Sequence, residues 1–122
     1  MPAAKTHTLK ITPDLPLANA QVFLRDVDGD MPQRSREALA VLLYELLLNA
    51  VRHGEQPVEL EVTYLSRTAR LVVRSGGPPF SWPNPPSSQI EGWGLRVVER
   101  VADRWGIRRS DSSNEVWVEV DH

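Results

Sequence analysis

The chain has 122 residues, of which 41% are hydrophobic, so it is long enough for one compact domain with a buried core. Its 14 basic and 16 acidic residues leave a formal charge of -2, which argues against a protein that holds nucleic acid through phosphate contacts. Cysteine is absent and the three histidines are far apart in the sequence, so we expect no disulfide, no thiolate zinc site and no cysteine nucleophile. Any bound metal is therefore expected to be a hard ion with oxygen ligands.

Hydrophobic periodicity and turn residues divide the chain into strands and helices. In chain order we predict a strand over 7–12, helices over 15–27 and 32–52, a hairpin of strands over 58–64 and 69–75, an irregular loop over 76–88, a helix over 95–105, and a hairpin formed by 107–110 and 116–120. Gly106 is the expected stop of the last helix. Apolar residues surround most of the helix over 32–52, so we expect it to be buried on most sides.

This order of elements predicts a two-layer α/β sandwich. The hairpins make neighbouring strands antiparallel, and three helices would cover one face of a mixed, mostly antiparallel sheet. No internal repeat is present and the proline-rich loop over 76–88 is too short to divide domains, so we predict one domain over residues 1–122. The absence of an apolar signal core or of an apolar run near the ~20 residues of a membrane helix predicts a cytoplasmic location.

Two polar residues stand inside the otherwise apolar helix over 32–52. Glu45 and Asn49 are four residues apart, so their side chains project side by side, and Arg52 joins that face. An amide oxygen can bind Mg²⁺, which takes few protein oxygens beside waters and phosphates, and a carboxylate can deprotonate a water or hydroxyl. The pattern predicts a magnesium and phosphate site. The alternative is that both side chains only tie down neighbouring backbone.

A second signal is the sequence Gly92-Trp93-Gly94-Leu95, which leads into a predicted helix. Glycine lets backbone amides approach an anion closely, and the first turn of a helix supplies unpaired N–H groups. By itself the sequence also fits a simple junction between a loop and a helix. In combination with Glu45 and Asn49 it predicts two elements that face one nucleotide from two sides.

These two stretches resemble motifs of a known family. The sequence Glu45-Leu-Leu-Leu-Asn49-Ala-Val-Arg52-His53 resembles the N-box of the GHKL superfamily of ATPases and kinases, and within it that of the anti-sigma-factor serine kinases. The stretch from Gly92 to Gly106 resembles the family's second glycine box and the helix that follows it. The resemblance covers nearly the whole chain and implies the Bergerat fold of the histidine-kinase-like ATPases.

The resemblance also implies ATP and Mg²⁺ as cofactors and a role for each matched residue. By resemblance Glu45 is the general base that activates a serine hydroxyl or a water, and Asn49 is the magnesium ligand. The residues assigned to cofactor binding in the same way are Asn49, Arg52, His53, Ser75, Gly77, Gly92, Gly94 and Leu95.

The first glycine box departs from the family pattern. In the family it reads roughly Asp-x-Gly-x-Gly, and its aspartate accepts a hydrogen bond from the amino group of adenine. Here Ser75 stands in the place of that aspartate and Pro79 in the place of the second glycine. A hydrogen bond to a charged group is worth about 1.5 to 3 kcal/mol, against about 1 kcal/mol for a neutral one. The exchange is expected to weaken adenine binding about ten-fold or more.

Two functions remain open from the sequence. The first is a regulator that binds Mg-ATP and a protein partner, either a sigma factor or an anti-anti-sigma-like antagonist, and phosphorylates the antagonist on serine; Glu45 and Asn49 favour it. The second is a non-catalytic relative that acts as a protein-interaction module with weak or no ATP binding, as Ser75 and Pro79 favour. A fragment like a histidine kinase is less consistent with the chain, which has no phospho-acceptor helix. A free sheet face would also allow a homodimer.

Overall fold

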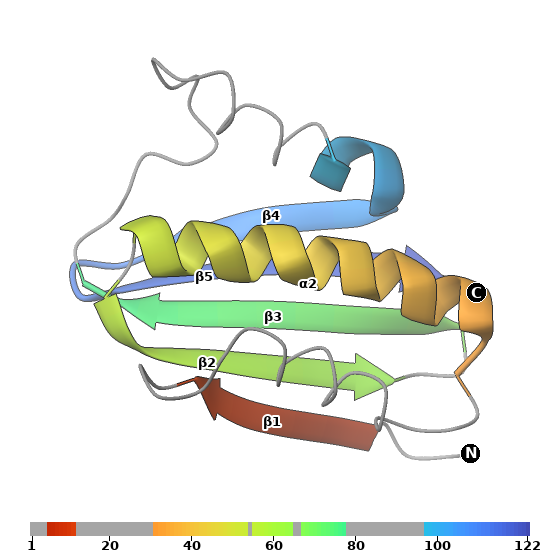
Figure 1. Ribbon diagram of the computed structural model, residues 1–122, viewed down its shortest axis with the longest axis horizontal. Coiled ribbons are helices and arrows are strands. Elements are labelled where there is room, and N and C mark those ends of the chain that lie inside the picture. The colour runs from red at the N-terminus through yellow and green to blue at the C-terminus, as the bar shows by residue number, and fades with distance from the viewer. Residues whose placement is uncertain (1–4, 12–30, 54, 65–66, 78–96) are drawn as a thin grey trace.

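The computed structural model describes residues 5–11, 31–53, 55–64, 67–77 and 97–122, and it shows a sheet covered on one face by a long helix (Figure 1). The helix is α2 (Gln33–His53), and the strands are β1 (Lys5–Ile11), β2 (Glu55–Tyr64), β3 (Thr68–Gly76), β4 (Arg104–Arg109) and β5 (Ser113–Asp121). The strand order is β1-β2-β3-β5-β4. The predicted α/β architecture is confirmed, but every described strand pair is antiparallel, so this part of the sheet is not mixed.

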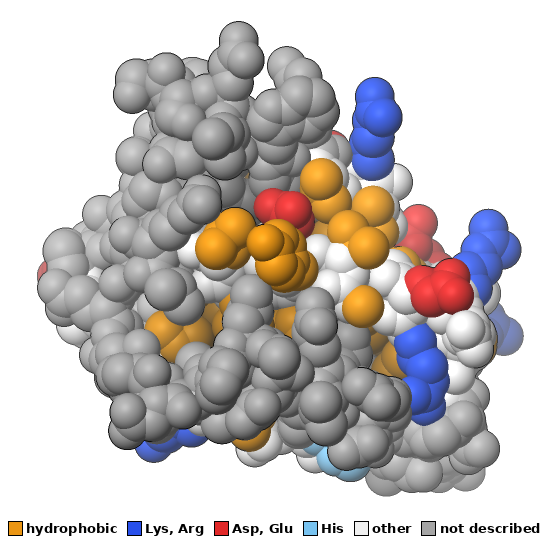
Figure 2. All heavy atoms as spheres, in the orientation of Figure 1, with side chains coloured by type: hydrophobic (Ala, Val, Ile, Leu, Met, Phe, Trp, Pro, Cys, Tyr) orange, Lys and Arg blue, Asp and Glu red, His pale blue; other side chains and the backbone are white. Residues whose placement is uncertain are grey.

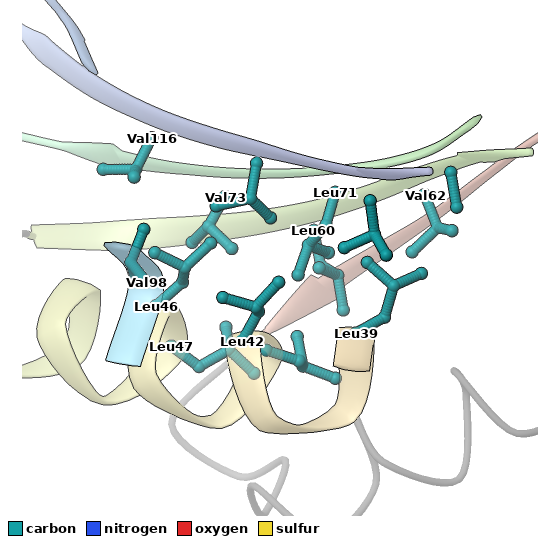
Figure 3. Packing of buried hydrophobic residues seen from close by; sticks show 14 of the residues in the cluster. Leu39, Leu42, Leu46, Leu47, Leu60, Val62, Leu71, Val73, Val98 and Val116 are labelled. Carbon is teal, nitrogen blue, oxygen red and sulfur yellow. The ribbon is translucent and has the colours of Figure 1, made fainter. Parts of the chain in front are cut away.

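The hydrophobic core lies between α2 and one face of the sheet. Every third or fourth residue of α2 faces the strands, and the side chains on this stripe are at most 4% exposed: Leu39, Leu42, Leu43, Leu46, Leu47 and Ala50. Alternate residues of the strands meet them, as Figure 3 shows for Leu60, Leu71 and Val73. Since full burial of one such side chain is worth about 1.5 to 3 kcal/mol, this contact fixes α2 on the sheet.

The expectation that α2 is buried on most sides fails at two large apolar side chains. Val41 and Tyr44 are 47% and 43% exposed. Figure 2 shows hydrophobic side chains gathered over α2 with an acidic side chain among them. Other apolar residues of α2, Ala38 and Ala40, are partly buried against the core. No helix in the described residues is long and apolar enough to cross a membrane.

The last predicted helix ends earlier than expected. Its described part ends at Val101, where the Ala102 N–H donates to the carbonyl of Val98 at 2.9 Å. The next amide, that of Asp103, already donates to the carbonyl of Glu119 at 2.8 Å, and β4 begins at Arg104. Gly106 therefore lies within a strand and does not stop a helix. The prediction for residues 102–105 is wrong because pairing with β5 determines their conformation.

The three predicted helices thus have three different outcomes. The helix over 32–52 is present as α2, and the helix over 95–105 is helical over 97–101 in its described part. Residues 12–30, which include the helix predicted over 15–27, lie outside the described residues.

The sheet face away from α2 carries ion pairs beside two apolar residues, Val72 and Trp117. The Arg74 guanidinium lies 2.8 Å from a carboxylate oxygen of Glu115, 3.3 Å from Glu61 and 3.4 Å from Glu59. The described charged side chains of the central strands therefore all lie on the sheet face away from α2. The other face of β3 and β5 is apolar except for two residues at one end, Ser75 and Asn114.

Candidate functional site

Glu45 lies at the border between the buried and exposed sides of α2. The next two residues, Leu46 and Leu47, pack against the sheet, while the preceding Tyr44 is exposed. The Glu45 side chain is half-buried and forms no ion pair with any other residue that the structure describes. A carboxylate in this position is anchored by a rigid helix and remains available to a ligand or a reacting hydroxyl.

The other predicted residues of this helix are close to its end. Asn49, Arg52 and His53 all belong to α2, and His53 is its last residue. The side chains of these three lie outside the described part of the structure. Their helical spacing places Asn49 one turn after Glu45. Within the described residues, no three His, Cys, Asp or Glu side chains form a group that could hold a metal ion.

Ser75 and Asn114 form a polar pair inside the core. They are 4% and 1% exposed, and they are paired in the register of β3 and β5, so both side chains share the face that α2 covers. The remaining residues of these two strands on that face are apolar, from Ala69 to Val73 and from Val116 to Val120. Buried polar groups need hydrogen-bonding partners, and Asn114 already interacts with another part of the chain.

A third buried polar residue has a structural explanation. Ser35, near the start of α2, forms a hydrogen bond of 2.6 Å with Nδ1 of His122. This bond ties the helix to the end of the described chain. Ser35 is near the start of α2, at the other end of the sheet from Ser75 and Asn114.

Asn114 was missed by the sequence analysis. It lies between the two predicted strands of the last hairpin, where the polar residues from Asp111 to Asn114 are typical of a turn. The signal that would have found it is the alternation of β5. Asn114, Val116 and Val118 are two residues apart, so they share one face of the strand, and a polar residue on a core face is unusual.

The helix residues and the strand pair lie at the same end of the sheet. In Figure 1, α2 and β3 run in the same direction, so the last turn of α2 lies beside the end of β3. Figure 3 agrees, because Leu39 lies toward Val62 whereas Leu46 lies toward Val73 and Val98. The turn of α2 that carries Asn49 therefore lies at the same end of the sheet as Ser75 and Asn114.

Gly77 directly follows β3 and contributes its backbone conformation. Its φ of 97° is in the left-handed region, which favours glycine over residues with a side chain. Its N–H donates to the carbonyl of Ser112 at 3.0 Å, so this amide is already bonded to the turn between β4 and β5. The structure thus gives Gly77 a role in the turn after Ser75.

The residues predicted to bind phosphate belong to a different segment of the chain. Gly92, Gly94 and Leu95, as well as Pro79, lie outside the described residues. Downstream of them, residues 97–101 are helical and Val98 is fully buried in the core. The proposed phosphate loop therefore leads toward a helical turn that is packed against the sheet.

A cavity of about 200 Å³ lies at the turn between β4 and β5. Its lining residues are Arg74, Arg108, Arg109, Ser110, Ser113, Asn114 and Glu115. Small-molecule pockets commonly measure roughly 300 to 1,000 Å³, so this cavity has room for only part of a ligand. Arg74, Arg108 and Glu115 belong to the sheet face away from α2, so this cavity does not lie between α2 and the sheet.

Comparison with known proteins agrees with this architecture. A family model described as the histidine kinase-like ATPase domain matches residues 12–120. The histidine kinase domain from the Erythrobacter litoralis EL346 blue-light activated histidine kinase is similar with a TM-score of 0.58 and 18% identity, over 85% of this chain and 62% of that one. The Acinetobacter baumannii histidine kinase AdeS is similar with a TM-score of 0.57 and 13% identity, over 70% of this chain and 46% of that one.

The two structures are longer than the chain, which spans less than two thirds of either. At these identities they show the fold alone. No curated protein matches the chain. The family model, however, extends over most of its length and includes both the α2 residues and the Ser75–Asn114 pair. The chain therefore belongs to the histidine kinase-like ATPase domain family.

Proposed function

We propose that this chain is a regulatory protein that binds Mg-ATP and a protein partner, as anti-sigma-factor serine kinases do. One observation carries the proposal. The buried pair Ser75–Asn114 lies at the same end of the sheet as the turn of α2 that contains Asn49, with Glu45 one turn before it. Membership of the histidine kinase-like ATPase family makes a nucleotide the ligand that best accounts for this arrangement.

The residues fit a nucleotide in two parts. Ser75 would offer a neutral hydroxyl beside apolar side chains, which suits a planar base better than a charged phosphate. Asn49 would provide one oxygen to Mg²⁺, and the backbone at Gly92 and Gly94 would hold the phosphates. When bound, Mg²⁺ neutralises phosphate charge and orients the phosphates for transfer.

Glu45 would act on the group that attacks the phosphate. Its half-buried carboxylate can accept the proton of a serine hydroxyl on a partner, provided that this hydroxyl comes within about 2.6 to 3.2 Å. The partner proposed here is a sigma factor for sequestration and an anti-anti-sigma-like antagonist for phosphorylation. The resemblance of the α2 sequence to the N-box of anti-sigma-factor kinases supports this assignment.

A second candidate function is favoured by Ser75 itself. A neutral hydroxyl occupies the position where the family's aspartate would accept a charged hydrogen bond, so the base would be held less tightly. In this alternative the fold serves as a protein-interaction module and ATP binds weakly or not at all. Glu45 and Asn49 would then have no catalytic role.

Calorimetry with Mg-ATP distinguishes the two functions. The proposal predicts saturable binding to the native chain and tighter binding to Ser75→Asp. If only Ser75→Asp binds, the native chain is the non-catalytic relative. If neither protein binds at millimolar nucleotide, the proposed function is wrong. Glu45→Gln serves as the control for catalysis, because it should retain the native affinity for Mg-ATP and lose only the phosphorylation of a partner.

A further inference from the structure

We infer that the side of α2 away from the sheet is the docking surface for the partner segment that carries the target serine. The surface is a docking stripe that consists of Glu37, Val41, Tyr44 and Leu48. It fits an extended segment with an apolar residue two positions from the serine and a basic residue four positions from it. The inference deepens the proposed function and rests on it, because it concerns the partner whose hydroxyl would meet Glu45.

The apolar part of the docking stripe is continuous. Val41 and Tyr44 are 47% and 43% exposed, and Leu48 is half-buried. Their spacing of three and four residues places the three side chains in one row along the helix. Figure 2 shows hydrophobic side chains gathered over α2. Single exposed apolar residues are common on protein surfaces, but a row over about two helical turns offers an area that a partner can bury, and tyrosine is enriched among residues that dominate binding.

The docking stripe leads directly to the proposed reaction centre. Val41, Glu45 and Asn49 follow one another at intervals of four residues in α2. Each side chain is therefore about 6 Å further along the axis and about 40° further around the helix than the one before. Glu45 thus lies between the exposed apolar row and the proposed Mg²⁺ ligand. A segment that follows α2 and places a serine at Glu45 brings its neighbouring residues over Val41 and Tyr44.

Distances along α2 determine which residues of the segment meet the docking stripe. An extended chain advances about 3.3 Å per residue, and its alternate side chains point to the same face. Two residues therefore span the interval of about 6 Å from Glu45 to Val41, and four residues span the interval of about 12 Å from Glu45 to Glu37. The residue two positions from the serine lies against Val41 and Tyr44, and the residue four positions away lies at Glu37.

Glu37 gives the far end of the docking stripe a negative charge. Its side chain is exposed and accepts a hydrogen bond of 3.2 Å from the amide of Gln33, which is a neutral partner. A lysine or arginine four positions from the serine has the complementary charge. Because this position is open to solvent, the contribution of the ion pair is small and decreases with ionic strength.

The test measures the transfer of labelled phosphate from Mg-ATP by the full native chain to a peptide library. Each peptide has one serine, and the positions around it are varied in turn. On one side of the serine, we expect valine, leucine or phenylalanine two positions away to raise the rate about five-fold or more over alanine. On the same side, lysine or arginine four positions away should raise the rate about two-fold over alanine at low salt.

Single substitutions on the docking stripe assign each preference to its residue. Tyr44→Ser and Val41→Ser should reduce the apolar preference to less than about two-fold, and should raise KM for the preferred peptide about five-fold with little change in kcat. Tyr44→Phe keeps the ring and should behave as the native chain does. Glu37→Gln should abolish only the preference for a basic residue. Glu45→Gln, which removes the proposed base, should lower kcat for every peptide.

The possible failures separate this inference from the proposed function. Phosphorylation without the apolar preference, or a preference that persists in both serine variants, would overturn the inference and leave the proposed function standing. Binding of Mg-ATP without phosphorylation of any peptide would also overturn it and leave nucleotide binding standing. If the native chain binds no Mg-ATP, both are wrong. Should the serine variants not fold by circular dichroism, the preference for a basic residue in the native chain and its loss in Glu37→Gln decide.

Discussion

At the scale of single residues, Gly106 makes room for the indole ring of Trp117 on the neighbouring strand. A Cβ atom at Gly106 would lie 2.7 Å from the Cε2, Cζ2 and Nε1 atoms of that ring, and the Arg70 guanidinium lies 4.9 Å from the centroid of the Trp117 ring. We expect Gly106→Ala to lower the free energy of unfolding by about 1 to 3 kcal/mol in urea denaturation, because the ring must move. In a Trp117→Leu background the same substitution should cost much less. An equal cost in both backgrounds would show that the ring is not the obstacle.

Asn49 is the residue on which the metal part of the proposal depends. Asn49→Ala removes the proposed oxygen ligand while alanine favours the helix, so magnesium-dependent nucleotide binding should be lost without a lower urea midpoint. Gln33→Ala, which removes an amide at the start of the same helix, should bind as the native chain does. Native affinity in Asn49→Ala would mean that this side chain has only a structural role.

At the scale of elements, the buried stripe of α2 should account for most of the stability that this helix contributes. Leu42 is fully buried, whereas the adjacent Val41 is 47% exposed. We expect Leu42→Ala to lower the free energy of unfolding by about 2 to 5 kcal/mol and Val41→Ala to change it by about 0.5 kcal/mol or less. Comparable losses in the two variants would contradict the placement of α2 on the sheet.

The end of β5 should make stability depend on acid. Hydrogen bonds from Arg104 and from Oγ1 of Thr68 hold the pKa of Asp121 below its ordinary value. A carboxylate with a depressed pKa stabilises the fold above its unfolded pKa, near pH 4, and loses that contribution as the pH falls through the folded pKa. The stability difference between the native chain and Asp121→Asn should therefore shrink from pH 6 to pH 2. A difference that stays constant from pH 6 to pH 2 would contradict this role of Asp121.

The sequence predicts helices and strands well where the hydrophobic residues fit only one of the two periodicities, helical or strand. The long leucine stripe has no strand alternative, and the alternation over 58–64 has no helical one, so α2, β2 and β3 agree with prediction within a few residues. Residues 101–107 satisfy both patterns. Val98 and Trp105 fit a helical stripe, but Trp105 and Ile107 also alternate and pair with Val118 and Val116 of β5. Pairing with β5, which is distant in the sequence, decides between the helical and the strand pattern. Rules based on local sequence do not include such a contact.

At the scale of the whole molecule, contacts between residues that are distant in the sequence also limit how much of the site the sequence predicts. Glu45 and Ser75 were identified by motif, because each belongs to a local stretch that resembles the family. Asn114 belongs to no such stretch, and it joins Ser75 only through the pairing of β3 with β5. The architecture itself was predictable, since hairpins and an amphipathic helix leave few ways to bury one face of a sheet. Side chains that are neighbours across two strands can be identified only once the strand pairing is known.

The most direct test of the account is a titration of the isotopically labelled chain with Mg-ATP, followed by backbone amide chemical shifts. The central claim is that one nucleotide binds between the second half of α2 and the end of β3. We predict that the largest shifts fall on Glu45, Ser75, Gly77 and Asn114, while Val72 and Glu119 at the centre of the ionically paired face change little. Shifts centred on that opposite face, or none at saturating nucleotide, would contradict the claim.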